Sequence, residues 1–69
     1  MTQAERIRSY METFGSITPL DAFRDLGITK LATRVSEMRA AGEQIESDWM
    51  EVENRFGEKV KFKRYRLNG

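Results

Sequence analysis

The chain has 69 residues, with twelve lysines and arginines against eleven carboxylates, so its net charge is only +1. It contains no cysteine and no histidine, which excludes disulfides and thiolate metal sites and removes the commonest metal ligand and general base. No apolar run approaches the roughly 20 residues that span a bilayer, and the N-terminal residues lack the apolar region of a secretory signal. We therefore expect one small domain over residues 1–69, without enzymatic activity or cofactor, in a reducing cytoplasm.

The first predicted element is a helix over residues 3–14. Thr2, followed three residues later by Glu5, forms a capping-box pattern, and Gly15 is suited to end the helix. Apolar residues at helical spacing predict its buried face. That face consists of Ala4, Ile7, Met11 and Phe14, widened by Tyr10.

Two further helices are predicted over residues 19–26 and 30–41, after a very short extended piece. Thr18 and Pro19 match the preferred residues for an N-cap and a first helical position. The short connection between the two helices contains a glycine, which is typical of a helix-turn-helix unit. The apolar face of the second helix is expected to be Leu20, Phe23 and Leu26, with Ala22 beside it. That of the third is expected to be Leu31, Val35 and Met38, with Ala32 beside them.

Beyond Gly42 the spacing of apolar residues changes from that of helices to that of strands. This change predicts a β-hairpin over residues 44–67 that turns at Asn54–Gly57. A hairpin after the second helix of a helix-turn-helix unit is the wing of a winged domain. The sequence thus predicts an α+β fold, a winged helix-turn-helix made of three helices followed by a two-stranded β-hairpin wing.

Partway along each strand of the hairpin, the apolar residues switch between even and odd positions, that is, from one face of the strand to the other. In the second strand Val60 and Phe62 share one parity, whereas Tyr65 and Leu67 share the other. A bulge or a strong twist would reconcile the two halves. We expect the inner half to pack on the helices, with Phe62, Tyr65 and Trp49 in the core, and the outer half to project from the domain.

Two segments resemble a known family: GSITPLDAFRDLGITKLATRVSEMRAAGEQIES, beginning at Gly15, and NRFGEKVKFKRYRL, beginning at Asn54. They are similar to the small winged helix-turn-helix proteins of tailed bacteriophages and prophages. The shared pattern includes a G-x-I-T-x-x-x-A stretch, an L-G-x-x-x-L-A-x-R-V run and a wing that begins N-R-x-G and ends Y-x-L. The resemblance implies DNA binding in transcriptional control or DNA processing, in the cytoplasm of a bacterial host.

Positive charge is concentrated near the C-terminus. Residues 55–69 hold six cations and one carboxylate, a net charge of +5, whereas residues 1–54 carry a net charge of −4. This asymmetry favours a polyanionic partner, and DNA requires cations at phosphates and shaped side chains at base edges. The predicted contacts to double-stranded DNA are Lys30, Thr33, Arg34 and Glu37 on the free face of the third helix and Arg55, Lys59, Lys61 and Lys63 on the wing.

Each of these assignments has an alternative. Arg34, the best candidate for a base contact, would otherwise be a surface arginine paired with Glu37 or Asp25. The wing lysines would otherwise protect strand edges from aggregation, and the run KFKRYR also suits stacking on single-stranded nucleic acid. Arg64 and Arg66 have the opposite parity to the lysines and are expected to pair with Glu46, Asp48 or the carboxylates of the first helix.

A second class of function also remains open. Four acids on the first strand of the hairpin would make the domain dipolar: Glu46, Asp48, Glu51 and Glu53. A polarised winged helix is suited to bind a protein, so the alternative is a domain that inhibits or modulates a host or phage complex, as anti-defence proteins do. A homodimer is also expected to be feasible, although no helix carries a spare apolar stripe for its interface.

Overall fold

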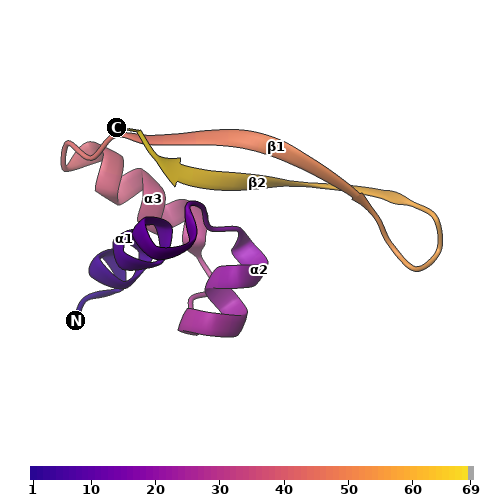
Figure 1. Ribbon diagram of the computed structural model, residues 1–69, viewed down its shortest axis with the longest axis horizontal. Helices are drawn as coiled ribbons and strands as arrows, with labels where there is room; N and C mark the ends of the chain where they lie inside the picture. The colour runs from indigo at the N-terminus through magenta and orange to yellow at the C-terminus, as the bar shows by residue number, and fades with distance from the viewer. Residues whose placement is uncertain (69) are drawn as a thin grey trace.

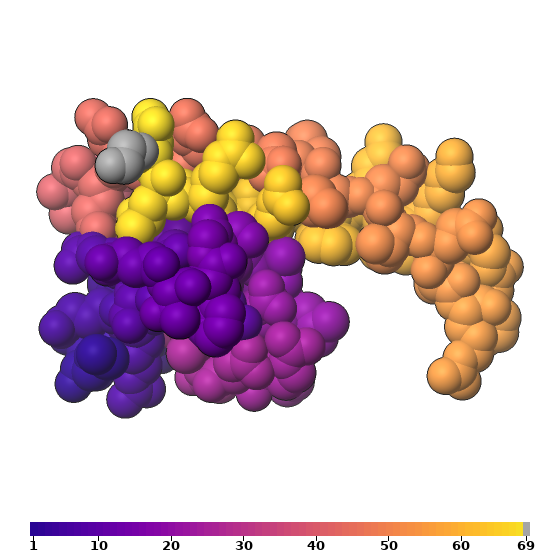
Figure 2. Space-filling model, in the orientation of Figure 1, coloured from indigo at the N-terminus to yellow at the C-terminus, as the bar shows by residue number. Residues whose placement is uncertain are grey.

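The computed structural model describes residues 1–68 and contains three helical regions followed by a two-stranded antiparallel hairpin, so the predicted α+β arrangement is confirmed (Figure 1). The elements in chain order are α1 (Gln3–Phe14), α2 (Pro19–Asp21), η1 (Ala22–Leu26), α3 (Leu31–Ala40), β1 (Ile45–Glu53) and β2 (Lys59–Leu67). The hairpin lies along one side of the helices and extends well beyond them, in a molecule of 39 × 22 × 21 Å (Figure 2). Within residues 1–68, no helix has the length and apolar character needed to cross a membrane.

The capping box predicted at the start of α1 is confirmed. Thr2 Oγ1 accepts a hydrogen bond from Glu5 N, and Glu5 Oε1 accepts one from Thr2 N, both at 3.1 Å. Gly15 ends the helix in the left-handed conformation, with φ of 88°. The predicted apolar stripe is wrong at Phe14, which is 68% exposed, whereas Ile17, beyond the turn at Gly15, is fully buried in its stead.

The second helix is α-helical only in its first turn. Thr18 caps α2, since Thr18 Oγ1 accepts from Asp21 N at 3.1 Å and Asp21 Oδ2 accepts from Thr18 N at 3.0 Å. From Ala22 onward the backbone follows a π-helix, η1, in which each turn holds about one extra residue. The Ala22 carbonyl accepts hydrogen bonds from beyond this turn, including one of 3.0 Å from Ile28 N.

The predicted apolar face of the second helix is wrong at Leu20 and Phe23, whereas Leu26 packs against the core as predicted. Leu20 and Phe23 are 66% and 60% exposed, whereas Ala22 is fully buried and Leu26 packs at the margin of the core. A small side chain therefore meets the core five residues before Gly27, at Ala22. In a regular α-helix, the residue that meets the core would be the one four positions before Gly27, which is the bulky Phe23.

The core lies between the helices and the base of the hairpin. α3 contributes Leu31, Val35 and Met38 as predicted, each at most 3% exposed. The buried set is Ile7, Met11, Ile17, Ala22, Ile28, Leu31, Val35, Met38, Ile45 and Tyr65. No polar or charged residue of residues 1–68 is buried with them, so the stability of this small core depends on apolar packing.

The hairpin pairs without interruption, from Ile45 opposite Leu67 to Glu53 opposite Lys59. Of the two predicted alternatives, a bulge or a strong twist, the bulge is ruled out, because every residue of β1 has one partner in β2. The predicted turn is confirmed by a hydrogen bond of 2.8 Å from Asn54 N to Glu58 O and by φ of 78° at Gly57.

The parity change instead reflects an exchange of polarity between the two faces of the hairpin. We call the face that packs on the helices the inner face; it carries Ile45, Ser47, Trp49, Glu51, Glu53, Lys59, Lys61, Lys63, Tyr65 and Leu67. The outer face carries Glu46, Asp48, Met50, Val52, Val60, Phe62, Arg64 and Arg66. The inner face is apolar at its base and charged toward the tip, whereas the outer face has the reverse order.

Where the hairpin leaves the helices, neither face has to be apolar, which is why the alternation need not continue. Tyr65 lies in the core as predicted, at 4% exposure. The core prediction is wrong for Trp49, which is 66% exposed, and for Phe62, which is half-buried outside the core cluster.

Replacing Leu31 by alanine should lower the free energy of unfolding by about 2–5 kcal/mol, because it opens a cavity in a core with few side chains. The matched change Leu20→Ala removes the same atoms from a side chain that is 66% exposed and should alter stability by no more than about 0.5 kcal/mol. Urea denaturation followed by circular dichroism measures both. Equal losses in the two variants would contradict the exposure of Leu20 and the burial of Leu31.

Candidate nucleic-acid interface

The two strands of the wing carry charges of opposite sign. β1 has four carboxylates and no cation: Glu46, Asp48, Glu51 and Glu53. β2 has five cations and no carboxylate: Lys59, Lys61, Lys63, Arg64 and Arg66. The hairpin is therefore a ribbon with one acidic and one basic edge, as the dipolar interpretation of the sequence anticipated.

On the outer face the charges of the two strands are paired with each other. Arg64 Nη2 lies 2.8 Å from Asp48 Oδ2, and Arg66 Nε lies 3.1 Å from Glu46 Oε2. Of the two groups of acids expected to pair with these arginines, the structure selects those of the partner strand and not those of the first helix. Both side chains are engaged within the hairpin and are the least available of the wing cations.

The remaining wing cations are the four predicted DNA contacts, Arg55, Lys59, Lys61 and Lys63. Within residues 1–68 none of them forms an ion pair within 4.0 Å, although Lys59 and Lys61 stand opposite Glu53 and Glu51 in the strand register. The Lys63 ammonium lies 5.3 Å from the centroid of the Trp49 ring, a cation–π distance. The three lysines thus form a row along the inner face, and their contact with DNA stays a prediction.

The tip of the wing is a rigid turn organised by Asn54. Its Oδ1 accepts hydrogen bonds from Phe56 N at 2.9 Å and from Glu58 N at 3.0 Å. The turn displays Arg55 together with Phe56, which is 82% exposed. Because the backbone is already fixed, these side chains can meet a ligand with little further ordering of the chain.

Of the four predicted DNA contacts at α3, Lys30, Thr33 and Glu37 are exposed and Arg34 is half-buried, and their contact with DNA stays a prediction. Lys30 is the N-cap and Thr33 is exposed on the side opposite the core. Arg34 and Glu37 lie on the flank toward α1, where Arg34 Nη1 is 2.6 Å from Glu37 Oε1. Of the two carboxylate partners considered for Arg34, the structure selects Glu37.

Sequence reasoning missed Ser36, which is exposed beside Thr33 and Ala40 on the side of α3 opposite the core. The signal was present in the helical period. A helix that buries Leu31 and Val35 turns positions 33, 36 and 40 outward. This outward face carries small, uncharged side chains, so the cations near α3 border the face and do not lie at its centre.

Two contacts set the angle between α3 and the wing. The Arg39 guanidinium donates to the Ile45 carbonyl at 3.0 and 2.8 Å and lies 5.8 Å from the centroid of the Tyr65 ring. Arg8 of α1 lies 2.6 Å from Glu43, in the loop between α3 and β1. These contacts join the third helix, the loop and the base of the wing into one unit.

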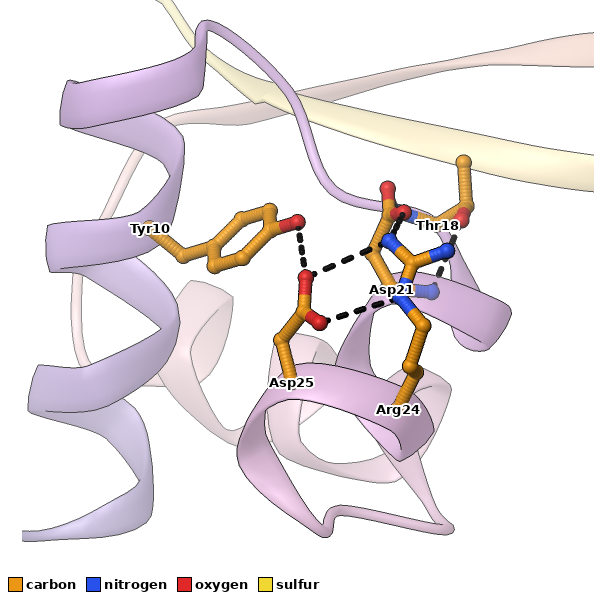
Figure 3. Close-up of polar contacts among 5 residues, drawn as sticks. All are labelled: Tyr10, Thr18, Asp21, Arg24 and Asp25. Carbon is orange, nitrogen blue, oxygen red and sulfur yellow. Dashed lines mark hydrogen bonds and ion pairs between the residues drawn. The ribbon is translucent and has the colours of Figure 1, made fainter.

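A polar cluster fixes the second helix against α1 (Figure 3). Tyr10 Oη donates to Asp25 Oδ2 at 2.6 Å. Arg24 donates to Asp25 Oδ1 from Nε at 3.0 Å and to Asp21 Oδ1 from Nη2 at 3.1 Å. Arg24 is thereby held by two carboxylates, which removes it from the set of cations available to a polyanion.

The same contacts shift proton affinities. The hydrogen bond from Arg24 and, after it, the one from Tyr10 lower the pKa of the Asp25 carboxyl, while the Asp25 hydrogen bond raises the pKa of Tyr10. Because the folded-state pKa of Asp25 lies below its ordinary value of about 4, the cluster stabilises the fold above that value. This stabilisation is lost as the pH falls through the lowered pKa.

Replacing Arg24 by glutamine should raise the pKa of Asp25, and Tyr10→Phe should raise it by less, because the arginine makes the largest contribution. Carbon-13 NMR of the carboxyl groups during an acid titration measures both shifts. Glu43, whose pKa is lowered by Arg8, is the internal control and should titrate as in the wild type. A larger shift for Tyr10→Phe than for Arg24→Gln would contradict the geometry of the cluster.

Comparison with known proteins shows that the profile of the winged helix-turn-helix domain family matches residues 2–69. The chain therefore belongs to this family. No curated protein and no solved structure matches it. Helix-turn-helix domains bind DNA by placing the second helix of the unit in the major groove, so family membership indicates a DNA-binding domain of a class that is typically non-enzymatic. Residues 1–68 contain no cluster of three side chains suited to hold a metal.

Proposed function

We propose that the protein binds double-stranded DNA sequence-specifically, as a regulator of transcription or an accessory factor in DNA processing of a phage or prophage, in the bacterial cytoplasm. The supporting observation is the division of the wing cations. Arg64 and Arg66 are paired on the outer face, while Arg55 and the three lysines of the inner face are free of carboxylate partners within residues 1–68. Cations that are not already neutralised are the ones a polyanion can use.

The lysine row suits a phosphate backbone. Alternate residues of a strand lie about 7 Å apart on the same face, so Lys59, Lys61 and Lys63 present a regular line of ammonium groups. Arg55 extends this line at the tip. Phosphate contacts of this kind fix position on the duplex and carry no sequence information.

Base recognition in this proposal comes from α3. Lys30 and Thr33 lie at its N-terminal end, where the recognition helices of helix-turn-helix proteins meet base edges. Arg34 would bridge O6 and N7 of a guanine after leaving Glu37, which holds it at 2.6 Å. The ion pair on this half-exposed flank is weak enough to exchange for a base contact.

Replacing Lys61 by glutamine should weaken binding similarly for all duplex sequences and reduce the slope of log affinity against log salt by about one unit, because one phosphate contact is lost. The control is Arg6→Gln, which removes the same charge from an exposed arginine of α1 that forms no ion pair within residues 1–68. α1 lies far from the tip of the wing (Figure 1). Fluorescence anisotropy across a salt series measures both slopes. Equal reductions would mean that only net charge matters and would refute the wing contact.

Replacing Arg34 by alanine should mainly reduce discrimination, by about 1–3 kcal/mol at one base pair. Glu37→Gln releases Arg34 from its partner and should strengthen binding to the preferred sequence. Competition binding with a selected duplex and its single-base variants measures these effects. If Arg34→Ala lowers affinity equally for every duplex, Arg34 is a phosphate contact and not a base contact.

The second candidate function, binding of a host or phage protein to modulate its activity, is supported by a different observation. The wing exposes large apolar side chains, including Trp49 at 66% and Phe56 at 82%. This candidate predicts that the wild type shows no salt-dependent affinity for duplex DNA and is retained on a protein from a host lysate. Salt-dependent duplex binding that requires Lys61 would exclude it as the main function.

A further inference from the structure

The outer half of the wing buries nothing within the described chain. From Trp49 to Phe62 no residue is buried, yet the outer face of this stretch is continuously apolar. Met50 stands opposite Phe62, and Val52, 47% exposed, stands opposite Val60, 43% exposed. We call these four residues the outer apolar patch: Met50, Val52, Val60 and Phe62.

A two-stranded ribbon of this kind is only marginally stable in water when neither face is covered. The helices cover the inner face at the base of the wing, and no helix or strand of residues 1–68 lies on the other side (Figure 1). Figure 2 shows the wing standing clear of the helices over its outer part. The outer apolar patch is thus open to a partner and gains stability from one, as a sheet does when a second sheet packs on it.

We propose that a second copy of this chain covers the patch, with the outer faces of two wings stacked about a two-fold axis that runs along the ribbon. Such an axis places β1 of one copy over β2 of the other. Two residues that pair across the strands of one hairpin then also contact each other across the interface, one from each copy. Val52 lies over the partner's Val60, and Met50 lies over the partner's Phe62.

Charge complementarity selects this axis over the alternative. Because β1 carries only acids and β2 only cations, an axis along the ribbon sets acidic strand over basic strand. Asp48 then faces the partner's Arg64, and Glu46 faces the partner's Arg66. A two-fold axis across the ribbon would set β1 over β1, with acid against acid, and is disfavoured.

Two unpaired polar atoms support the same arrangement. Asp48 Oδ1 and Arg64 Nε are shielded from solvent and lack a hydrogen-bond partner in the described chain. Each lies on the outer face, directly beside the apolar patch. Within the hairpin, Asp48 Oδ1 lies 3.7 Å from Arg66 Nη1, which is an ion-pair distance but too long for a hydrogen bond. In the stacked pair, rotation of the two side chains toward the interface brings an acceptor on Asp48 to a donor on the partner's Arg64, which supplies the missing hydrogen bonds.

The helices do not obstruct this contact, since they pack on the inner face. The lysine row also lies on the inner face and therefore points away from the dimer interface on both copies. The dimer would present two equivalent basic rows. This pairing requires only the wing and stands independently of whether the ligand of those rows is DNA.

Sedimentation velocity from low micromolar to near-millimolar protein tests the proposal. The wild type should move from the mass of one chain to that of two, and the double variant Val52→Gln/Val60→Gln should remain a monomer throughout. The matched control is Trp49→Gln, which removes a larger exposed apolar side chain from the inner face and should dimerise as the wild type does. Thermal melts of the three proteins confirm folding, because none of these residues belongs to the core.

A wild type that stays monomeric at every concentration overturns the proposal, and so does a dimer that survives the double valine change but is lost in Trp49→Gln. The orientation has its own test, since the chain has no cysteine. Stacked sheets lie about 10 Å apart, so a short bis-maleimide should link Val52→Cys to Val60→Cys in a mixture of the two variants. Preferential linking of Val52→Cys to itself would overturn the axis along the ribbon.

Discussion

The geometry of the domain depends on the pair of backbone hydrogen bonds between Ile17 and Tyr65, each 2.8 Å long. Ile17 follows α1 and Tyr65 lies in β2, so this one bridge ties the start of the helix-turn-helix unit to the wing. Both residues are buried, at 0% and 4% exposure, which shields the bridge from competition by water. Arg39 completes the junction from α3 by donating to the Ile45 carbonyl and lying over the ring of Tyr65. The direction of the wing is therefore set by its base.

Beyond that base the wing is a ribbon with two solvent-facing sides, and the two sides carry chemically different residues. The inner face carries three lysines that form no ion pair within residues 1–68, two of them opposite Glu51 and Glu53 in the register. The outer face carries arginine–carboxylate pairs followed by an apolar patch. Because the two faces diverge chemically, one wing can serve two contacts at the same time. The proposed DNA contact uses the first face, and the proposed dimer uses the second. A uniformly basic hairpin would serve only the first.

The helical stripe of Leu31, Val35 and Met38, the caps at Thr2 and Thr18, and the turn at Asn54 were all predictable, because each depends on residues close in sequence. The register of η1 was not, since an α-helix and a π-helix differ by one residue per turn and the choice is made by packing Ala22 into the core. The hairpin shows the same limit. The sequence shows that the apolar residues switch between even and odd positions partway along each strand. Only the strand register and the position of the helices show that the two faces exchange polarity without a bulge.

For the candidate site, the sequence identified the cations of the wing, and their odd or even positions separated the lysines from the arginines that pair with acids. The choice of Glu37 as the partner of Arg34 required the three-dimensional structure. The most direct test of DNA binding by the wing is to follow the backbone amide NMR signals of the wild type during titration with duplex DNA. The account predicts that shifts concentrate at Arg55, at Lys59–Lys63 and at the N-terminal end of α3, and weaken with added salt. Shifts confined to α1, or none at low salt, would contradict it.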